Sequence, residues 1–209
     1  MKTLLICFSL LVLGSGYSYS QETSRVEVFG GYSLEHISAC GAPGDTFLTC
    51  SGFIETGNST PANYNGWDGS LSAFVYRFFG VSGDVSGHYG TTVIRGNGLP
   101  SASTFRYSFM FGPIAALRRR DYQPFVHALF GGVFNKFGAF EFGAESANVP
   151  SYTKFAWAVG GGIDLVASRR LSVRVGQFDY ERVGVPNTLG PSYAPVGGYR
   201  FAAGIVFKL

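Results

Sequence analysis

The side chains best suited to acid–base chemistry are two histidines in stretches of alternating polarity, His88 and His127. Asp84 and Ser86 precede His88 at every second position, so the three share one face of an extended strand. A histidine that activates a serine, or that an aspartate orients, must lie within hydrogen-bond distance of its partner. An internal hydrogen-bond network explains the same spacing, and we therefore expect no catalytic residue and no enzyme activity.

A second polar set lies nearer the C-terminus. Arg174, Gln177 and Asp179 share one face only if the strand absorbs one extra residue near Gly176, as a β-bulge does. They would then meet Arg200 on the neighbouring strand. We interpret the set as a structural ion network, and the alternative is a gate whose rearrangement opens a narrow path.

The remaining motifs predict a disulfide and no metal or cofactor. Cys40 and Cys50 form a close pair in a chain with an export signal, which predicts one disulfide. Zinc is the weaker alternative, because structural sites take four ligands and His36 is the one extra candidate nearby. The glycines at 160–162 precede no helix, so they predict no dinucleotide site. The arginines at 118–120 are interpreted as a solvated turn.

The composition favours an exported membrane protein. Apolar residues make up 46% of the 209 residues and charged ones 14%, below the roughly 25% charged residues of soluble domains. The net charge of +3 gives no reason to expect a nucleic-acid partner. Residues 1–20 read as a signal peptide, with Lys2 before an apolar stretch and cleavage between Ser20 and Gln21. Residues 21–209 would form one domain.

Eight segments of the mature chain alternate in polarity with the period of a β-strand. Most reach the roughly 9–11 residues that a tilted membrane strand needs. The predicted strands cover residues 25–35, 66–78, 81–89, 104–117, 124–134, 155–165, 171–181 and 198–209.

The connections between these segments alternate in length. Long ones are predicted at 37–65, 90–103, 135–154 and 182–197, and short ones near 79–80, 118–122 and 166–170. Long loops at one end and short turns at the other are typical of outer-membrane barrels. The predicted fold is all-β: an eight-stranded antiparallel up-and-down transmembrane β-barrel, with long extracellular loops and short periplasmic turns. His88 and His127 would lie near opposite ends.

The apolar faces are predicted to point outward and the polar faces inward. Aromatic residues gather toward the strand ends, as an interfacial girdle requires, and an eight-stranded interior has little room for so many rings. The polar faces carry small residues and scattered charges of both signs, which must pair if buried. The predicted polar network of the lumen is Glu27, Asp84, His88, Arg106, His127, Asp164, Arg174, Gln177, Asp179 and Arg200.

The mature chain resembles the small OmpA/OmpX-type outer-membrane β-barrel domains along essentially its whole length. The matching stretches are EVFGGYS, GWDGSLS, FMFGP, PFVHALFGG, GGGID, RVGQFDY and RFAAGIVFKL. The resemblance implies a bacterial outer-membrane location and a C-terminal assembly signal at Phe201, Ile205, Phe207 and Leu209. Leu209 stands where the family normally has Phe. We expect no peptidoglycan-binding domain after the last strand, and the resemblance assigns no specific activity.

The expected role is structural or surface-interacting, through the extracellular loops. A narrow or gated channel for small solutes is the first alternative, and a membrane-embedded lipid-modifying enzyme is the second. The expected partners are outer-membrane lipid, the barrel-assembly machinery during biogenesis and an extracellular ligand that the sequence does not name.

Overall fold

The computed structural model describes the chain between residues 25 and 209, with gaps. Residues 1–20, the predicted signal peptide, lie outside the described part, as do Cys40 and Cys50 and most of the predicted long loops. The described residues are 25–38, 62–93, 101–138, 140–142, 145–147, 151–184 and 196–209.

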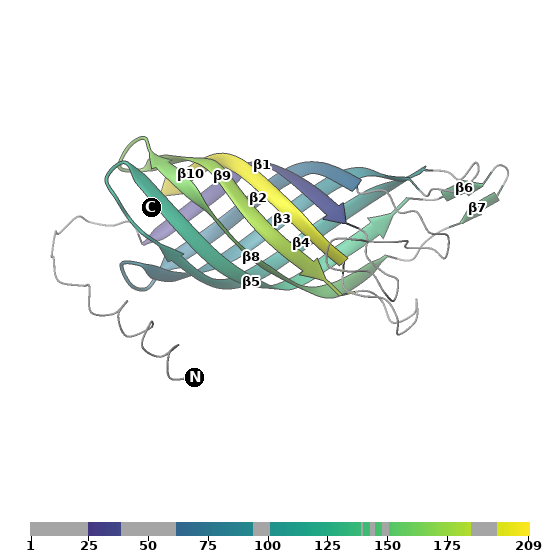
Figure 1. The fold of residues 1–209 in the computed structure, drawn as a ribbon, viewed down its shortest axis with the longest axis horizontal. Coiled ribbons are helices and arrows are strands. Elements are labelled where there is room, and N and C mark those ends of the chain that lie inside the picture. The colour runs from purple at the N-terminus through teal and green to yellow at the C-terminus, as the bar shows by residue number, and fades with distance from the viewer. Residues whose placement is uncertain are drawn as a thin grey trace.

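Eight long strands of the described part close into one antiparallel barrel (Figure 1). Each pairs with its neighbour in sequence, and the first pairs with the last over the register Glu27–Lys208 to Ser38–Gly197. The barrel strands are β1 (Val26–Ser38), β2 (Ala62–Phe74), β3 (Phe79–Val93), β4 (Ser101–Ala116), β5 (Tyr122–Phe137), β8 (Tyr152–Val166), β9 (Leu171–Val183) and β10 (Val196–Lys208). The predicted fold class is confirmed.

A small hairpin of β6 (Phe140–Phe142) and β7 (Glu145–Ala147) lies at one end of the barrel, and the C-terminus lies at the other (Figure 1). The predicted loop 135–154 therefore contains strands that its sequence pattern did not indicate. Among the described residues, no helix has the length and hydrophobicity required to cross a membrane.

The predicted end of the second strand is wrong. The pattern extends it to residue 78, because Val75 keeps the apolar phase, whereas β2 ends at Phe74. The amides of Val75 and Tyr76 both donate to the Phe79 carbonyl at 3.0 Å. These hydrogen bonds place Val75 and Tyr76 in the turn and not in the strand. Both side chains are exposed, and an apolar turn is compatible with a membrane interface.

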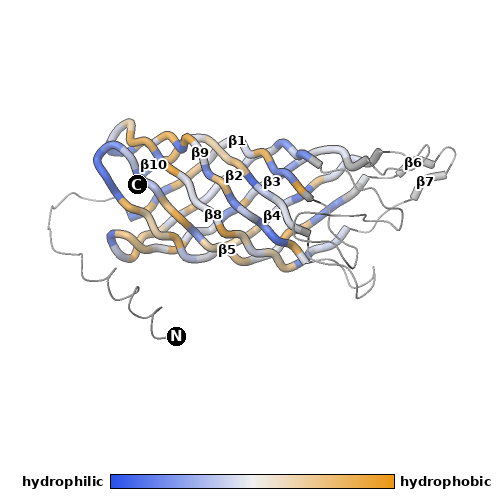
Figure 2. The backbone as a smooth tube through the Cα atoms, viewed as in Figure 1, coloured by the Kyte–Doolittle hydropathy of each residue, from blue (hydrophilic) through white to orange (hydrophobic). Residues whose placement is uncertain are grey.

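The outward face of the strands is apolar and the inward face is largely polar. Hydrophobic and hydrophilic residues accordingly alternate along the barrel strands in Figure 2. Large exposed apolar side chains include Phe111, Val81 and Phe155, at 72, 57 and 64% exposure. Such a surface is stable in lipid and not in water. The four residues of the predicted assembly signal, Phe201, Ile205, Phe207 and Leu209, are exposed on this outer face.

The predicted β-bulge in β9 is confirmed. Ile163 pairs with Gly176 and Asp164 with Arg174, so β9 carries one extra residue opposite β8. The same shift occurs against β10. The bulge turns Arg174 and Gln177 to the same side, and both are buried.

Candidate functional site: the filled interior of the barrel

All ten residues predicted to line the lumen are buried, each with at most 7% of its surface exposed. They do not form one continuous cluster. Four groups follow one another through the barrel, each built around an arginine or a glutamate.

The central group surrounds Arg200 of β10. This side chain donates to Asp179 from Nε and Nη2, at 3.1 and 2.8 Å, and to Asp84 from Nη1 at 2.8 Å. Nη1 also donates to Ser86 at 3.1 Å. Asp68 lies 3.7 Å from Arg200 Nε, and no donor of the described residues makes a hydrogen bond to it. One guanidinium therefore faces three buried carboxylates.

Asp179 joins this centre to the next group. It accepts a hydrogen bond from Gln177 Nε2 at 2.7 Å, and His127 Nε2 lies 2.7 Å from its other oxygen. The predicted contact with Arg200 is therefore present for Asp179, and Gln177 is joined to Arg200 through Asp179.

The guanidinium group of Arg174 has hydrogen-bond partners at its edges and aromatic rings on its faces. It donates to Asp164 at 2.8 and 3.2 Å and to Gln177 at 2.6 Å. Its Cζ atom lies 4.2 Å from the Phe29 ring centroid and 4.1 Å from that of Phe125. A cation between two aromatic faces is favourable when desolvated, so this group fills the lumen across its width.

The group nearest the long loops is built on Arg106. It donates to Glu35 at 2.8 Å and to Asn135 at 3.3 Å, and it pairs with Glu181. His88 joins this group through Glu35, whose Oε2 lies 3.3 Å from His88 Nδ1.

The catalytic arrangement of His88 with Asp84 and Ser86, which the sequence left as an alternative, is not present. Asp84 and Ser86 bind Arg200, and His88 Nε2 lies instead 2.9 Å from Ser33 Oγ. Asp84, Ser86 and His88 all point into the lumen because they share one face of β3. That shared face does not determine which residues they contact, because their partners lie on other strands.

His88 lies between Ser33 and Glu35, as the base of a hydrolytic triad lies between the nucleophile and the orienting carboxylate. Ser33 Oγ also donates to the Phe201 carbonyl at 3.3 Å. All three side chains are at most 2% exposed, so a substrate has no room beside the hydroxyl in this structure. Within the described residues, no group of three or more histidine, cysteine or acidic side chains is arranged to hold a metal ion.

At the short-turn end the lumen is capped by Glu27. It accepts hydrogen bonds from Arg118 at 2.9 Å and from Gln123 at 3.1 and 3.2 Å, and Lys208 donates to Gln123 at 3.3 Å. Arg118 also lies over the Phe74 ring. Burial lowers the pKa of the Arg118 guanidinium in this turn, and the charge of Glu27 acts in the opposite direction.

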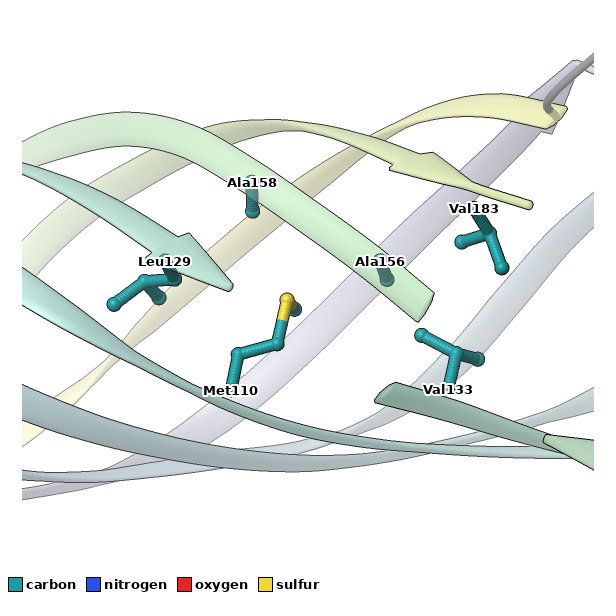
Figure 3. Close-up of a cluster of buried hydrophobic side chains, with 6 residues drawn as sticks. All are labelled: Met110, Leu129, Val133, Ala156, Ala158 and Val183. Carbon is teal, nitrogen blue, oxygen red and sulfur yellow. The ribbon is translucent and has the colours of Figure 1, made fainter. Parts of the chain in front are cut away.

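One part of the interior, at the level of Met110 and Leu129, is apolar (Figure 3). Leu129, Val133, Ala156 and Ala158 have no exposed surface, and Met110 packs with them. Asp84 of β3 and Met110 of β4 are partners in register, so polar and apolar lining meet between the two strands at this level.

The glycines at 160–162 make room for this filling. A Cβ atom at Gly160 would overlap the Asp179 carboxylate, and one at Gly162 would lie 2.9 Å from the Phe125 ring. Their role in the structure is steric.

Sequence reasoning missed several charged members of the lumen, notably Glu35, Asp68 and Glu181. Glu35 has the same alternation phase as Glu27, and Glu181 the same as Asp179, so the phase of each strand would have identified both. They were overlooked because they end the predicted strands, where a loop residue was equally compatible.

Comparison with solved structures gives the fold. The crystal structure of Ail, the attachment invasion locus protein of Yersinia pestis, matches 88% of this chain and 99% of its own at 17% identity, with a TM-score of 0.52. Ail in complex with the heparin analogue sucrose octasulfate matches with a TM-score of 0.53. Neisserial surface protein A matches 90% of this chain and all of its own at 12% identity, with a TM-score of 0.58.

No protein-family model matches the chain, and no curated protein matches it in sequence. The fold therefore rests on structure: a closed antiparallel barrel with an apolar outer surface and a charge-paired interior. The chain has the fold of the small eight-stranded outer-membrane barrels of the OmpA/OmpX and Ail type.

Proposed function

We propose that this chain is a surface-binding protein whose barrel is a closed, rigid support for ligand-contacting extracellular loops. The observation that carries the proposal is the filled interior. Arg200 and Arg174 span the lumen with their hydrogen bonds and ring contacts, and the predicted lumen residues are at most 7% exposed. A solute would have to displace several buried ion pairs to pass.

The length of the strands supports a role outside the membrane. β4 and β5 have 16 residues each, whereas about 9–11 suffice to cross the bilayer. Trp67 and Tyr89, joined by a hydrogen bond of 3.2 Å, mark an aromatic interface on the long-loop side. Beyond them the outward positions Asn63, Thr91 and Lys136 are exposed and polar. The barrel wall thus continues into water and carries the loops above the surface.

The structural likeness to Ail, an attachment invasion locus protein solved with a heparin analogue, favours attachment as the kind of surface role. The test is adherence of bacteria that display the chain, with immobilised heparin and extracellular-matrix proteins as probes. Variants shortened within 41–60 or within 143–150 leave the barrel strands intact. We expect the full chain to raise adherence and at least one shortened variant to lose it while keeping its heat-modifiable migration in gels.

Two results would contradict the proposal. Discrete single-channel steps in planar bilayers would favour the channel instead. Covalent labelling by a fluorophosphonate probe that disappears in Ser33→Ala would favour a lipid-modifying or other hydrolytic enzyme. We expect neither, because the lumen is filled and Ser33 is buried.

A further inference from the structure

Arginine is concentrated at the short-turn end of the barrel. The chain has 12 arginines, and seven lie in the three short turns or directly before β1. They are Arg25, Arg77, Arg118, Arg119, Arg120, Arg169 and Arg170. The interior network uses one of the seven, Arg118, which binds Glu27.

Backbone hydrogen bonds bring these segments into one rim. The Arg25 carbonyl accepts from the Phe74 amide at 2.7 Å, and the Arg170 carbonyl accepts from Lys208 at 2.9 Å. The Asp121 carbonyl accepts from Val166, also at 2.9 Å. The start of the barrel, its three turns and its last strand are therefore neighbours around the end that carries the C-terminus (Figure 1). We call the seven residues the arginine rim.

The arginine rim is exposed and has little opposing charge. Its members other than Arg118 are exposed. Of the acidic groups described at this end, Asp121 and the C-terminal carboxylate of Leu209 are on exposed residues, whereas Glu27 and Asp164 are buried and paired inside. The rim is thus a strongly positive surface on a chain whose overall charge is only +3.

Apolar side chains lie beside the arginines and determine how deep in the membrane interface the arginines lie. Val75 and Tyr76, directly before Arg77, are 73 and 75% exposed, and Leu117 and Tyr122 flank the turn between β4 and β5 with 43 and 46% exposure. Exposed aromatic and aliphatic residues at a barrel end reside at the membrane interface. They hold the neighbouring guanidinium groups at the level of lipid headgroups and not in free periplasm.

We propose that the arginine rim binds the phosphate groups of anionic phospholipids in the inner leaflet of the outer membrane. Guanidinium matches phosphate geometry with two parallel hydrogen bonds. Basic residues near an anionic membrane surface each contribute attraction that salt screens. The apolar residues of the turns favour a lipid over a soluble polyanion, because they gain nothing from a ligand in water.

The test is native mass spectrometry of the purified barrel, released from micelles that hold equal amounts of phosphatidylglycerol and phosphatidylethanolamine with the same acyl chains. We compare the wild type with Arg119→Gln/Arg120→Gln. The matched control, Lys136→Gln/Lys154→Gln, removes the same charge at the other end. Each basic residue near the surface changes binding by roughly fivefold. We therefore expect the ratio of bound phosphatidylglycerol to bound phosphatidylethanolamine to fall by about fivefold or more in the rim variant and to stay unchanged in the control.

Equal retention of the two lipids by the wild type would overturn the proposal, as would an equal loss in the Lys136→Gln/Lys154→Gln control. Peptidoglycan is the other acidic partner available in the periplasm. Co-sedimentation with purified peptidoglycan sacculi tests whether the arginine rim binds it. If the arginine rim retains sacculi in detergent and shows no preference for phosphatidylglycerol, the partner is the cell wall and the lipid assignment is wrong. The substituted turn residues are exposed, and heat-modifiable migration checks that both variants fold.

Discussion

The two sides of the barrel interior are filled by different means. Around Arg200 of β10 the filling is ionic, with Asp84 of β3 and Asp179 of β9 as its partners. At the level of Leu129 and Val133 it is apolar, although Arg106 of β4, His127 of β5 and Asp164 of β8 are polar farther along the same strands. The outer surface is lipid-facing on both sides, so the difference belongs to the interior alone.

The contrast predicts that the two regions differ in their tolerance of substitutions. Apolar side chains fill space by shape alone, and losing one leaves a cavity. Ion pairs fill space only while every partner is present, because a single charge left in the interior is costly. The ionic side should therefore be the more sensitive to single substitutions, and the apolar side the more tolerant.

Arg200→Met should have the largest effect. The substitution keeps much of the side-chain volume but leaves Asp84 and Asp179 without their guanidinium. We expect a loss of about 3–5 kcal/mol in the free energy of unfolding, measured by urea titration in phospholipid vesicles. Arg200→Lys, which keeps the charge but not the forked geometry, should lose less. Equal stability of Arg200→Met and the wild type would show that the ionic side contributes only filling.

Arg174→Ala should follow, at about 3 kcal/mol. It removes the partner of Asp164 and the cation between Phe29 and Phe125. The variant also tests the gate hypothesis, because planar-bilayer recordings should stay silent although stability falls. Channel openings that appear only in Arg174→Ala would support the gate hypothesis.

On the apolar side, Leu129→Ala should cost about 2–3 kcal/mol by leaving a cavity. Leu129→Met, which conserves volume, should cost less than about 1.5 kcal/mol. Both are measured by the same titration. If Leu129→Ala proves as damaging as Arg200→Met, the two sides are equally intolerant and the contrast fails.

Asp68→Asn should have the smallest effect and sharpens the comparison within the ionic side. Asp68 is 1% exposed, lies 3.7 Å from Arg200 and makes no hydrogen bond to a donor of the described residues. Removing this charge should change the free energy of unfolding by less than about 1 kcal/mol, or raise it. A loss comparable to that of Arg200→Met would mean that Asp68 is required to balance the arginine.

Alternating polarity predicted the strands and the inward faces, and even the bulge near Gly176, because each follows from the period of one strand. The pattern predicted the contact of Asp179 with Arg200 on the neighbouring strand, but it did not predict partners across the lumen. Arg200 and Asp84 are 116 residues apart, and their contact depends on strand register and on reach across the lumen, which no single strand encodes. The error at Val75 has a similar origin, since an interfacial turn and a lipid-facing strand select the same apolar residues.

The pairing of β1 with β10 has a consequence for the order of assembly. Glu35 on β1 binds Arg106 on β4, and Arg200 on β10 binds Asp84 on β3. Neither contact can form within a hairpin of neighbouring strands, so a partly assembled sheet must keep these charges hydrated. Water leaves the interior only when the first and last strands meet over their full register. Sealing of the seam and drying of the lumen are therefore one cooperative event, and a sheet that closes in the wrong register would remain wet.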